Sequence, residues 1–318
     1  MILSDWIKQN IEYLERAGIE NAKYEPYLWL SQISGKNRAF FISHANDETN
    51  GLFSETQRFA LKEISRRRQK NEPLAYITGS SSFWGHIFRV GPGVLIPRPD
   101  SETVIETALS RFGLLPFPAG RTSGGRMPET AAISAADGTF RFMDLCTGSG
   151  CLGISIGLAL NQKGINCKGV LTEISPDALT YADINICTHD LQKNLLLCAC
   201  DLLPERNVLS DFWGPEQADL ILSNPPYITD EDMTGLMPDV SDYEPQIALR
   251  GGADGLVFYR RILSEATPLL ASGGILVMEH GYDQGESVPA LCRDYGYEHV
   301  QCIRDYGGNP RVTAAKKI

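Results

Sequence analysis

The carboxyl-terminal half of the sequence alternates short apolar runs with helical stretches, and this alternation constrains the fold more than any other feature. The apolar runs are typical of buried strands. Strands are predicted at residues 140–145, 168–173, 195–200, 218–223, 274–279 and 298–303, and helices near residues 151–163, 176–187 and 255–271. Apolar strands that alternate with helices favour a mostly parallel sheet covered on both faces, so the predicted class is α/β.

Residues 1–72 follow a different pattern, because their apolar side chains recur at helical spacing. The clearest run is Leu3, Trp6, Ile7, Ile11 and Leu14. A later helix is expected to begin after Ser54 as its N-cap and to end in the basic run 66–70. That run either complements the helix dipole or contacts RNA or an acidic partner. The segment predicts a small helical domain.

Residues 73–100 change character again. Runs at 76–79 and 83–90 predict a β-hairpin. Residues 113–139 are rich in Gly, Pro, Ser, Thr and Ala and lack a sustained period. They are expected to form a flexible surface loop.

A short proline-flanked segment follows the predicted hairpin. Arg98 stands between two prolines and is expected to be extended, because a residue before proline avoids the α region. The helix that follows carries Val104, Ile105, Ala108 and Leu109. Asp100 or Ser101 is expected to cap that helix.

Size and charge limit the class of protein. The chain has 318 residues, of which 43% are hydrophobic, enough for one large domain and a smaller one. Its formal net charge of −10 argues against tight nonspecific binding to nucleic acid, which needs a basic face. The sequence shows no targeting signal and no apolar run of membrane-spanning length. We expect a cytoplasmic monomer without a membrane or nucleic-acid partner.

The cysteines do not form a metal motif. There are eight cysteines and five histidines, and the closest cysteine pair is Cys198 with Cys200. Zinc sites usually show C-x-x-C spacing or clustered histidines. No metal site is predicted, and the thiols are expected to be reduced.

A glycine-containing turn follows the first predicted strand. Gly148 and Gly150 lack a Cβ, so the backbone there can approach a ligand and adopt a positive φ. Residues 148–153 match the letters of the dinucleotide fingerprint G-x-G-x-x-G. The match is weak evidence alone, because a tight strand–helix turn without a ligand uses the same glycines.

Acidic residues stand at the ends of the first three strands. Asp144 comes just before the glycine turn, where it could meet a cationic ligand. Glu173 can accept hydrogen bonds from both ribose hydroxyls, as in NAD and S-adenosylmethionine sites. Asp201, followed by Leu202, is placed to hold the adenine edge. Together these residues favour S-adenosylmethionine over a dinucleotide.

The fourth strand ends in Asn224-Pro225-Pro226-Tyr227. Proline has no N–H and a fixed φ, so two prolines stop the strand and stiffen the turn. The Asn amide and the Tyr ring are therefore expected on a rigid corner at the carboxyl edge, where open α/β sheets bind ligands. An amide has both donor and acceptor, so the corner can hold the planar –NH2 of an amide or an aminopurine.

These motifs resemble those of a known family. Residues 142–153, Glu173, Asp201 and 224–227 resemble class I S-adenosylmethionine-dependent methyltransferases that act on planar nitrogen. More narrowly, the chain resembles the peptide chain release factor glutamine N5-methyltransferases. The stretches that carry the narrower likeness are 72–79, 83–85, 94–102, 244–249, 251–252, 254–256 and 305–312.

The resemblance implies a fold and an activity. It implies a Rossmann-like methyltransferase domain at 101–318 with a mostly parallel seven-stranded sheet, preceded by a helical substrate-docking domain at 1–72 and a β-hairpin hinge at 73–100. The implied cofactor is S-adenosyl-L-methionine. The implied substrate is the glutamine of the Gly-Gly-Gln motif in class I release factors, methylated at N5 in support of translation termination.

The resemblance also implies site residues. The implied cofactor-binding residues are Cys146, Thr147, Gly148, Ser149, Gly150, Glu173, Asp201, Leu202 and Asn224, and the implied catalytic residues are Asn224, Pro225, Pro226 and Tyr227. The sequence departs from the family pattern at three places. Cys146 stands where many relatives have Gly, Leu202 stands where an aromatic residue is frequent, and the 113–139 loop is longer than usual.

Three other functions fit parts of the pattern. A DNA or RNA adenine-N6 methyltransferase uses the same corner, but the acidic charge and the segment around Arg98 speak against it. A ribosomal-protein glutamine methyltransferase is the nearest alternative. A binding module that retains the fold without activity is disfavoured by the intact corner and by Glu173.

Overall fold

The computed structural model describes residues 1–318 apart from residues 20, 119, 123–129, 134–136 and 216. The chain divides into two compact units. The first unit consists of Met1–Gly79 and Met237–Tyr243, and the second of Ser80–Leu236 and Glu244–Ile318. In the described part of the chain, no helix has both the length and the apolar character needed to cross a membrane.

The first unit is built of short helices around one apolar core. Its helices are α1 (Leu3–Arg16), α2 (Glu25–Ser34), α3 (Arg38–Ser43), α4 (Thr49–Leu52), α5 (Glu55–Arg68), α6 (Leu74–Thr78) and α11 (Pro238–Ser241). Leu3 and Leu14 of α1 are completely buried beside Trp29, Leu30 and Phe41. The predicted helical region is therefore confirmed.

Helix α5 begins with a capping box. The Gln57 N–H donates to Ser54 Oγ at 3.2 Å, and the Ser54 N–H donates to Gln57 Oε1 at 2.9 Å. Both bonds satisfy N–H groups that the first helical turn leaves without an intrahelical partner. The N-cap expected at Ser54 is present.

The basic run at the end of α5 is used inside the first unit. Arg68 is buried and donates to both carboxylate oxygens of Glu25, at 2.9 and 3.0 Å. The neighbouring side chains also pair, Arg66 with Glu63 and Arg67 with Glu72. These contacts favour an architectural role for the run over a contact to RNA or an acidic partner.

We predict that Arg68→Ala destabilises the first unit by about 3–5 kcal/mol, because it leaves the Glu25 carboxylate buried without its partner. The measurement is urea unfolding of the full chain followed by tryptophan fluorescence, since Trp29 lies in the same core. The control is Arg66→Ala, which breaks an exposed pair and is expected to lower the free energy of unfolding far less. Equal effects of the two substitutions would contradict the prediction.

The hairpin begins later than the sequence predicted. Residues 76–79 were expected as its first strand, but residues 76–78 fall in helix α6, which follows Pro73, and Gly79 caps its carboxyl end with φ +71°. The observed strands are β1 (Ser80–Phe83) and β2 (His86–Arg89). Both residues of their turn, Trp84 and Gly85, have positive φ, as a type I′ hairpin turn requires. The β-rich composition around Tyr76 misled the prediction, because the glycine that ends a helix resembles a turn signal.

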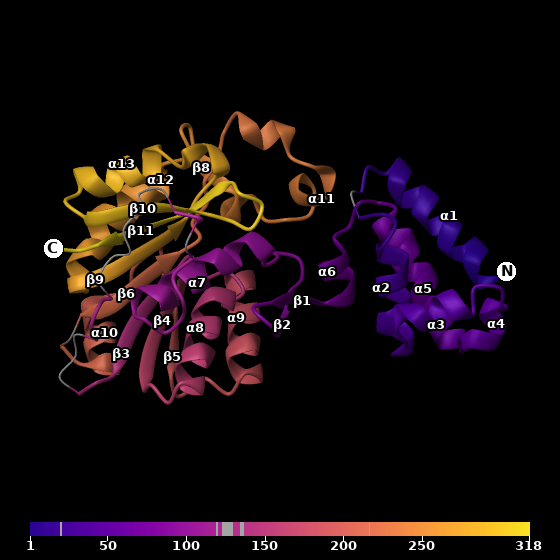
Figure 1. The fold of residues 1–318 in the computed structure, drawn as a ribbon, viewed down its shortest axis with the longest axis horizontal. Helices are drawn as coiled ribbons and strands as arrows, with labels where there is room; N and C mark the ends of the chain where they lie inside the picture. The colour runs from indigo at the N-terminus through magenta and orange to yellow at the C-terminus, as the bar shows by residue number, and fades with distance from the viewer. Residues whose placement is uncertain (20, 119, 123–129, 134–136, 216) are drawn as a thin grey trace. The chain divides into compact units, whose positions relative to one another are not determined.

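A seven-stranded sheet forms the centre of the second unit (Figure 1). Its strands are β3 (Phe140–Leu145), β4 (Cys167–Glu173), β5 (Leu195–Ala199), β6 (Ala218–Ser223), β9 (Leu270–Glu279), β10 (Glu298–Arg304) and β11 (Pro310–Lys316). The order is β10-β11-β9-β6-β3-β4-β5, with β11 antiparallel to both neighbours and the pairs from β9 to β5 parallel. The predicted mostly parallel sheet is confirmed.

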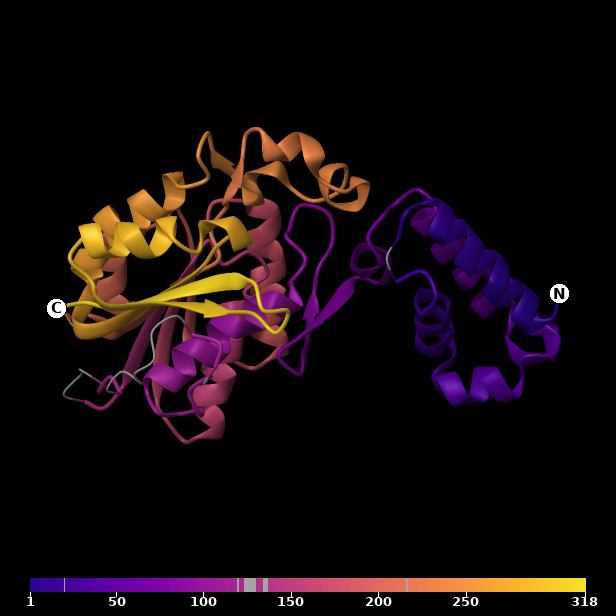
Figure 2. The same cartoon turned by 45° about the horizontal axis from the view of Figure 1, so that its top comes forward.

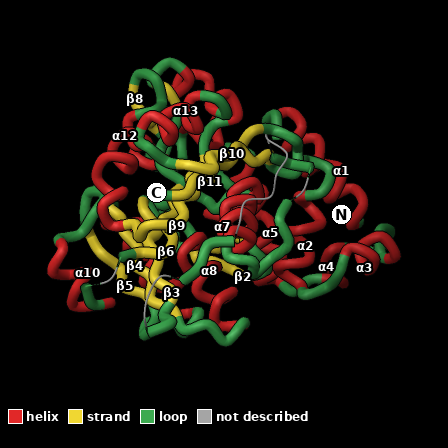
Figure 3. The backbone as a smooth tube through the Cα atoms, turned by 60° about the vertical axis from the view of Figure 1, so that its left-hand side comes forward, coloured by secondary structure: helices red, strands yellow, loops and turns green. Residues whose placement is uncertain are grey.

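Helices cover both faces of this sheet (Figures 2 and 3). Side chains of α7 (Glu102–Arg111), α8 (Cys151–Gln162) and α9 (Pro176–Thr188) share one apolar cluster with Phe140 and Phe142 of β3. Side chains of α10 (Arg206–Trp213), α12 (Val257–Arg261) and α13 (Ser287–Asp294) share another with Met143 and Leu145. Alternate residues of β3 thus enter opposite clusters, as a strand buried on both faces requires.

Short elements join these layers. They are β7 (Ile228–Thr229), β8 (Arg250–Gly252), the 3-10 turns Pro99–Ser101, Asp232–Gly235, Gln246–Ala248, Thr267–Leu269 and Tyr282–Gln284, and a π-helical turn at Ile262–Ala266. The helix predicted for 255–271 is divided among α12, the π-helical turn and a 3-10 turn containing Pro268, and β9 already begins at Leu270.

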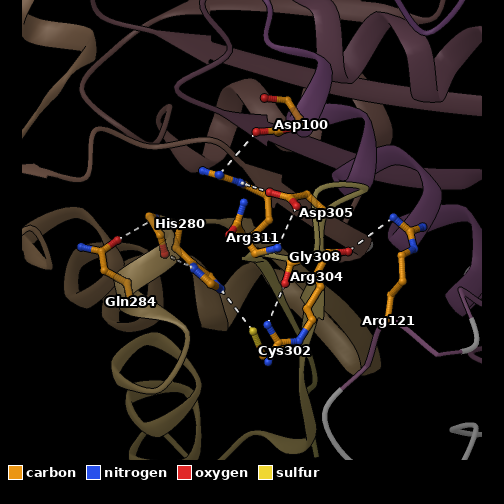
Figure 4. Close-up of polar contacts among 12 residues, drawn as sticks. Asp100, Arg121, His280, Gln284, Cys302, Arg304, Asp305, Gly308 and Arg311 are labelled. Atoms are coloured by element: carbon orange, nitrogen blue, oxygen red, sulfur yellow. Dashed lines mark hydrogen bonds and ion pairs between the residues drawn. The ribbon is translucent and has the colours of Figure 1, made fainter. Parts of the chain in front are cut away.

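The predicted 113–139 loop lies partly outside the described residues, at 119, 123–129 and 134–136. Its expected flexibility stays a prediction. Of the described part, Thr122 forms an isolated bridge with Ile303 of β10, and Arg121 donates to the Arg304 carbonyl at 3.4 Å (Figure 4). These contacts anchor the described part of the loop to β10.

Candidate active site

A cavity of about 290 Å³ lies at the carboxyl edge of the parallel strands. Of the predicted site residues, eight line it: Cys146, Thr147, Gly148, Ser149, Glu173, Asp201, Asn224 and Pro226. Four predicted residues, Gly150, Leu202, Pro225 and Tyr227, are not among the described residues of its wall. The structure therefore brings most of the predicted site together at one edge.

The β3–α8 turn takes left-handed backbone at three positions. Cys146, Gly148 and Gly150 have φ of +58°, +56° and +82°. Glycine adopts this conformation freely, whereas an L side chain pays about 1–2 kcal/mol. A Gly at position 146 would adopt this conformation without strain, and this chain keeps the geometry with a half-buried cysteine.

Asp144 braces the turn and does not face a ligand as the sequence suggested. Its side chain is fully buried, and Oδ2 accepts hydrogen bonds from Thr147 Oγ1 and from the Gly153 N–H at 2.8 Å. Oδ1 has no hydrogen-bond partner among the described residues. Burial raises the pKa of this carboxyl to about 7. Asp144 therefore connects the start of the turn to helix α8.

Glu173 holds the turn from the neighbouring strand. Its Oε2 accepts from the Gly148 N–H at 2.9 Å, and its Oε1 accepts from the Ile174 and Ser175 N–H groups at 2.9 Å. A carboxylate offers about four acceptor positions, so it keeps capacity for a further donor. Glu173 lines the cavity and has the chemistry expected for a ribose diol.

The two predicted residues that follow β5, Asp201 and Leu202, lie in different surroundings. Asp201 lines the cavity and pairs with Arg261 at 2.9 Å. Leu202 has φ +69°, its side chain is buried in the sheet core, and its carbonyl accepts from Thr172 Oγ1 at 2.8 Å. Leu202 is not among the described residues of the cavity wall, and its predicted adenine-side contact stays a prediction. Phe258 of α12 lines the cavity instead, and the only sequence signal near it is the preceding Gly-rich stretch.

The chain turns sharply after β6, at Asn224-Pro225-Pro226-Tyr227. Tyr227 is largely buried, and burial raises the pKa of its phenol to about 12. A Cβ on Gly251 would lie 2.6 Å from Tyr227 Cα, and one on Gly255 would lie 2.4 Å from the Tyr227 carbonyl oxygen. The glycines at 251 and 255 are thus required where a second chain segment crosses the corner.

The proline-flanked segment approaches the corner from another side. Arg98 lines the cavity and pairs with the buried Glu244, whose Oε2 accepts from the Ile96 N–H at 3.3 Å. The cap expected from Asp100 or Ser101 is wrong, because no described side chain caps α7. The Asn224 Nδ2 donates to Ser101 Oγ at 3.4 Å instead.

The β10–β11 turn supports this segment (Figure 4). Arg311 lies 3.4 Å from Asp100 and 3.2 Å from Asp305 in two ion pairs. Asp305 is buried and also accepts from the Asn309 N–H at 2.9 Å. The carboxyl-terminal motif at 305–312 therefore fixes the start of α7 beside the corner.

The residues around the cavity fit S-adenosylmethionine. The glycine turn brings backbone to the wall, Glu173 and Asp201 supply acceptors for hydroxyl and amino groups, and apolar side chains such as Val94 and Phe258 supply the remaining surface. Ligand sites of this kind are largely apolar with a few placed polar groups. The sheet order and this site define a class I S-adenosylmethionine-dependent methyltransferase.

Comparison with known proteins narrows the class. Residues 5–79 match the family model described as the PrmC N-terminal domain. A protein of Clostridium botulinum named release factor glutamine methyltransferase is 33% identical over all of both chains. One of the same name from Escherichia coli is 30% identical over 98% of this chain and 97% of that one. A solved methyltransferase from Pyrococcus furiosus is 17% identical with a TM-score of 0.44, over 83% of this chain and 99% of that one.

The chain belongs to the release factor glutamine methyltransferase family, since its full length matches such relatives at 30% identity or more.

We predict that the usual stability order of Gly and Ala is reversed at Cys146. At an ordinary position Gly is less stable than Ala by about 0.5–1 kcal/mol. Here the free energy of unfolding of Cys146→Gly is expected to be higher than that of Cys146→Ala by about 1 kcal/mol. Both substitutions remove the thiol, but only Gly relieves the strain of the left-handed backbone. The test is urea unfolding of both variants. A less stable Gly variant would contradict the strain at this position.

The buried Asp144 makes stability depend on pH. Its folded pKa is raised from 3.8 to about 7, so its contribution is complete below pH 3.8 and is lost as the pH rises through about 7. At about 1.4 kcal/mol per pKa unit the loss is at most about 4 kcal/mol. The Asp144→Asn variant should show a flatter unfolding free energy between about pH 4 and pH 8. Equal pH slopes for variant and parent would be evidence against the raised pKa.

Proposed function

We propose that this protein transfers a methyl group from S-adenosyl-L-methionine to the side-chain amide nitrogen, N5, of the glutamine in the Gly-Gly-Gln motif of class I release factors. One observation carries the proposal: the Asn224–Tyr227 corner stands at the cavity beside the glycine turn and Glu173, in a chain that matches the family over its full length. The activity supports translation termination.

The cofactor site is assigned to residues of three strand ends. The turn from Cys146 to Gly150 supplies backbone groups, Glu173 accepts from the ribose, and Asp201 stands at the adenine edge. When bound, the cofactor supplies an electrophilic methyl group on a positively charged sulfur. We also assign a contact with the adenine to Phe258, because Phe258 is on the cavity wall whereas the Leu202 side chain is buried in the core.

The corner holds the substrate amide. An amide nitrogen is a poor nucleophile, because its lone pair is delocalised into the carbonyl. We assign Asn224 Oδ1 and the Pro225 carbonyl as acceptors for the two amide hydrogens, so that the nitrogen is fixed for in-line attack. Pro226 keeps the turn rigid, and Tyr227 packs against the flat amide and excludes water. After transfer, the product proton leaves to water.

We infer that the substrate is a protein, and that the helical region at the amino terminus contributes to docking it. A release factor works at the ribosome, so we also infer a cytoplasmic location. The corner alone would accept an adenine amino group, and a ribosomal-protein glutamine has the same chemistry as a release-factor glutamine. Family membership over the full chain favours the release factor.

The test separates these substrates. The protein is incubated with labelled S-adenosylmethionine and, in separate reactions, a class I release factor, ribosomal proteins and DNA. Label is expected on the release factor and not on a release factor whose Gly-Gly-Gln glutamine is replaced by glutamate. Label on DNA or on ribosomal protein in preference to the release factor would overturn the proposal.

We predict that Asn224→Ala lowers kcat by about 100-fold or more, because the amide loses an acceptor that fixes it, while the Kd of S-adenosylmethionine changes less than about threefold. Steady-state kinetics and isothermal titration calorimetry measure the two quantities. The control is Asn207→Ala, an exposed asparagine of α10, which should leave both unchanged. Equal losses of turnover and cofactor affinity would exclude the orienting role.

A further inference from the structure

The Ser101 hydroxyl is buried at a helix start without serving as its cap. Ser101 is 2% exposed, and no described side chain caps α7. Its oxygen instead receives a hydrogen bond from Asn224 Nδ2 at 3.4 Å. The same hydroxyl also favours the charged form of the Glu279 carboxyl and so lowers its pKa against the larger, raising effect of burial. The Ser101 hydroxyl, which the sequence predicted as a helix cap, thus lies between the ends of β6 and β9.

The sheet register brings those two ends together. Strand β6 pairs in parallel with β9, and Ser223 stands opposite Met278. The next residues of the two strands, Asn224 and Glu279, therefore leave the same edge as neighbours. Ser101 reaches both from the start of α7, which packs against the same region of the sheet.

The number of protons fixes the direction of this hydrogen-bond chain. A serine hydroxyl has one proton to donate and lone pairs to accept, whereas an ionised carboxylate can only accept. Ser101 must then donate to Glu279, which leaves its lone pairs for the Asn224 Nδ2. When the Asn224 side-chain nitrogen donates to Ser101, the side-chain oxygen points away from Ser101. That oxygen is the acceptor that a substrate –NH2 group needs.

We propose that Ser101 and Glu279 are positioning residues, which turn the Asn224 side-chain oxygen toward the glutamine amide. This inference deepens the proposed function and rests on it for the identity of the substrate. The charge on Glu279 acts through Ser101 on Asn224, and none of its effect requires contact between Glu279 and the substrate.

The surroundings of Glu279 make the chain sensitive to pH. Glu279 is 2% exposed, its Oε2 has no hydrogen-bond partner among the described residues, and burial raises its pKa to about 7. The titratable and charged groups around it are Arg98, Asp100, Cys151, Tyr227, Tyr259 and Arg311. A protonated Glu279 can donate to Ser101, and Ser101 can then donate its own proton to the Asn224 oxygen. The direction of the hydrogen bonds from Glu279 to Asn224 therefore reverses as the pH falls.

Nuclear magnetic resonance tests the direction without any substrate. The full-length protein is labelled with 15N-asparagine, and the Asn224 side-chain amide is assigned by its loss in Asn224→Ala. The Asn224 resonance is expected to shift with a midpoint near pH 7 in the parent and to stop titrating in Glu279→Gln and Ser101→Ala. A resonance that does not titrate in the parent, or titrates equally in both variants, would overturn the inference.

Kinetics supply a second readout. Ser101→Ala is expected to lower kcat by about 10- to 100-fold with less than about threefold change in the Kd of S-adenosylmethionine, and Ser101→Thr, which keeps the hydroxyl, should restore kcat to within about threefold. An unchanged kcat in Ser101→Ala would overturn the positioning role while the proposed function stands. A parent that leaves the release factor unmethylated would refute the proposed function instead, and the resonance would still decide the hydrogen-bond direction.

Discussion

The register of three neighbouring strands determines where the chemistry of this protein can occur. Leu145 of β3 stands opposite Ser223 of β6, and Ser223 stands opposite Met278 of β9. The Ser223 hydroxyl donates to the Leu145 carbonyl at 2.7 Å, which ties the first pair at the edge. The residues that follow are the glycine turn, the Asn224 corner and Glu279. A slip of one residue in either pair would separate the cofactor turn from the substrate corner, because side chains alternate between faces.

Hydrogen-bonded and paired polar groups then hold this edge in shape. Asp144 connects the turn to α8, Glu173 accepts three backbone N–H groups beside it, and Arg311 connects the carboxyl-terminal hairpin to Asp100. Such groups are costly to bury without partners. Their orientation fixes backbone and amide directions that apolar packing alone leaves open. The site is therefore rigid where the substrate amide must be aligned.

Much of this could be predicted from the sequence, because its signals are local. Short stretches of sequence predict the local conformation of the apolar strands β3, β4 and β6, of the helix start at Ser54 and of the turn at prolines 225 and 226. Strand β11 was missed because it begins with Pro310 and its centre is rich in alanine, a poor strand former. The partners of Ser101 and Leu202 could not be predicted, because each depends on contacts between segments far apart in the chain.

The central claim is that the corner after β6 directs a methyl group onto a glutamine amide nitrogen. The most direct measurement is fragmentation mass spectrometry of a class I release factor after incubation with the protein and S-adenosylmethionine. The account predicts one added methyl group on the side-chain amide nitrogen of the glutamine in the Gly-Gly-Gln motif. A methyl group on any other residue, or an unmodified release factor beside methylated nucleic acid, would contradict it.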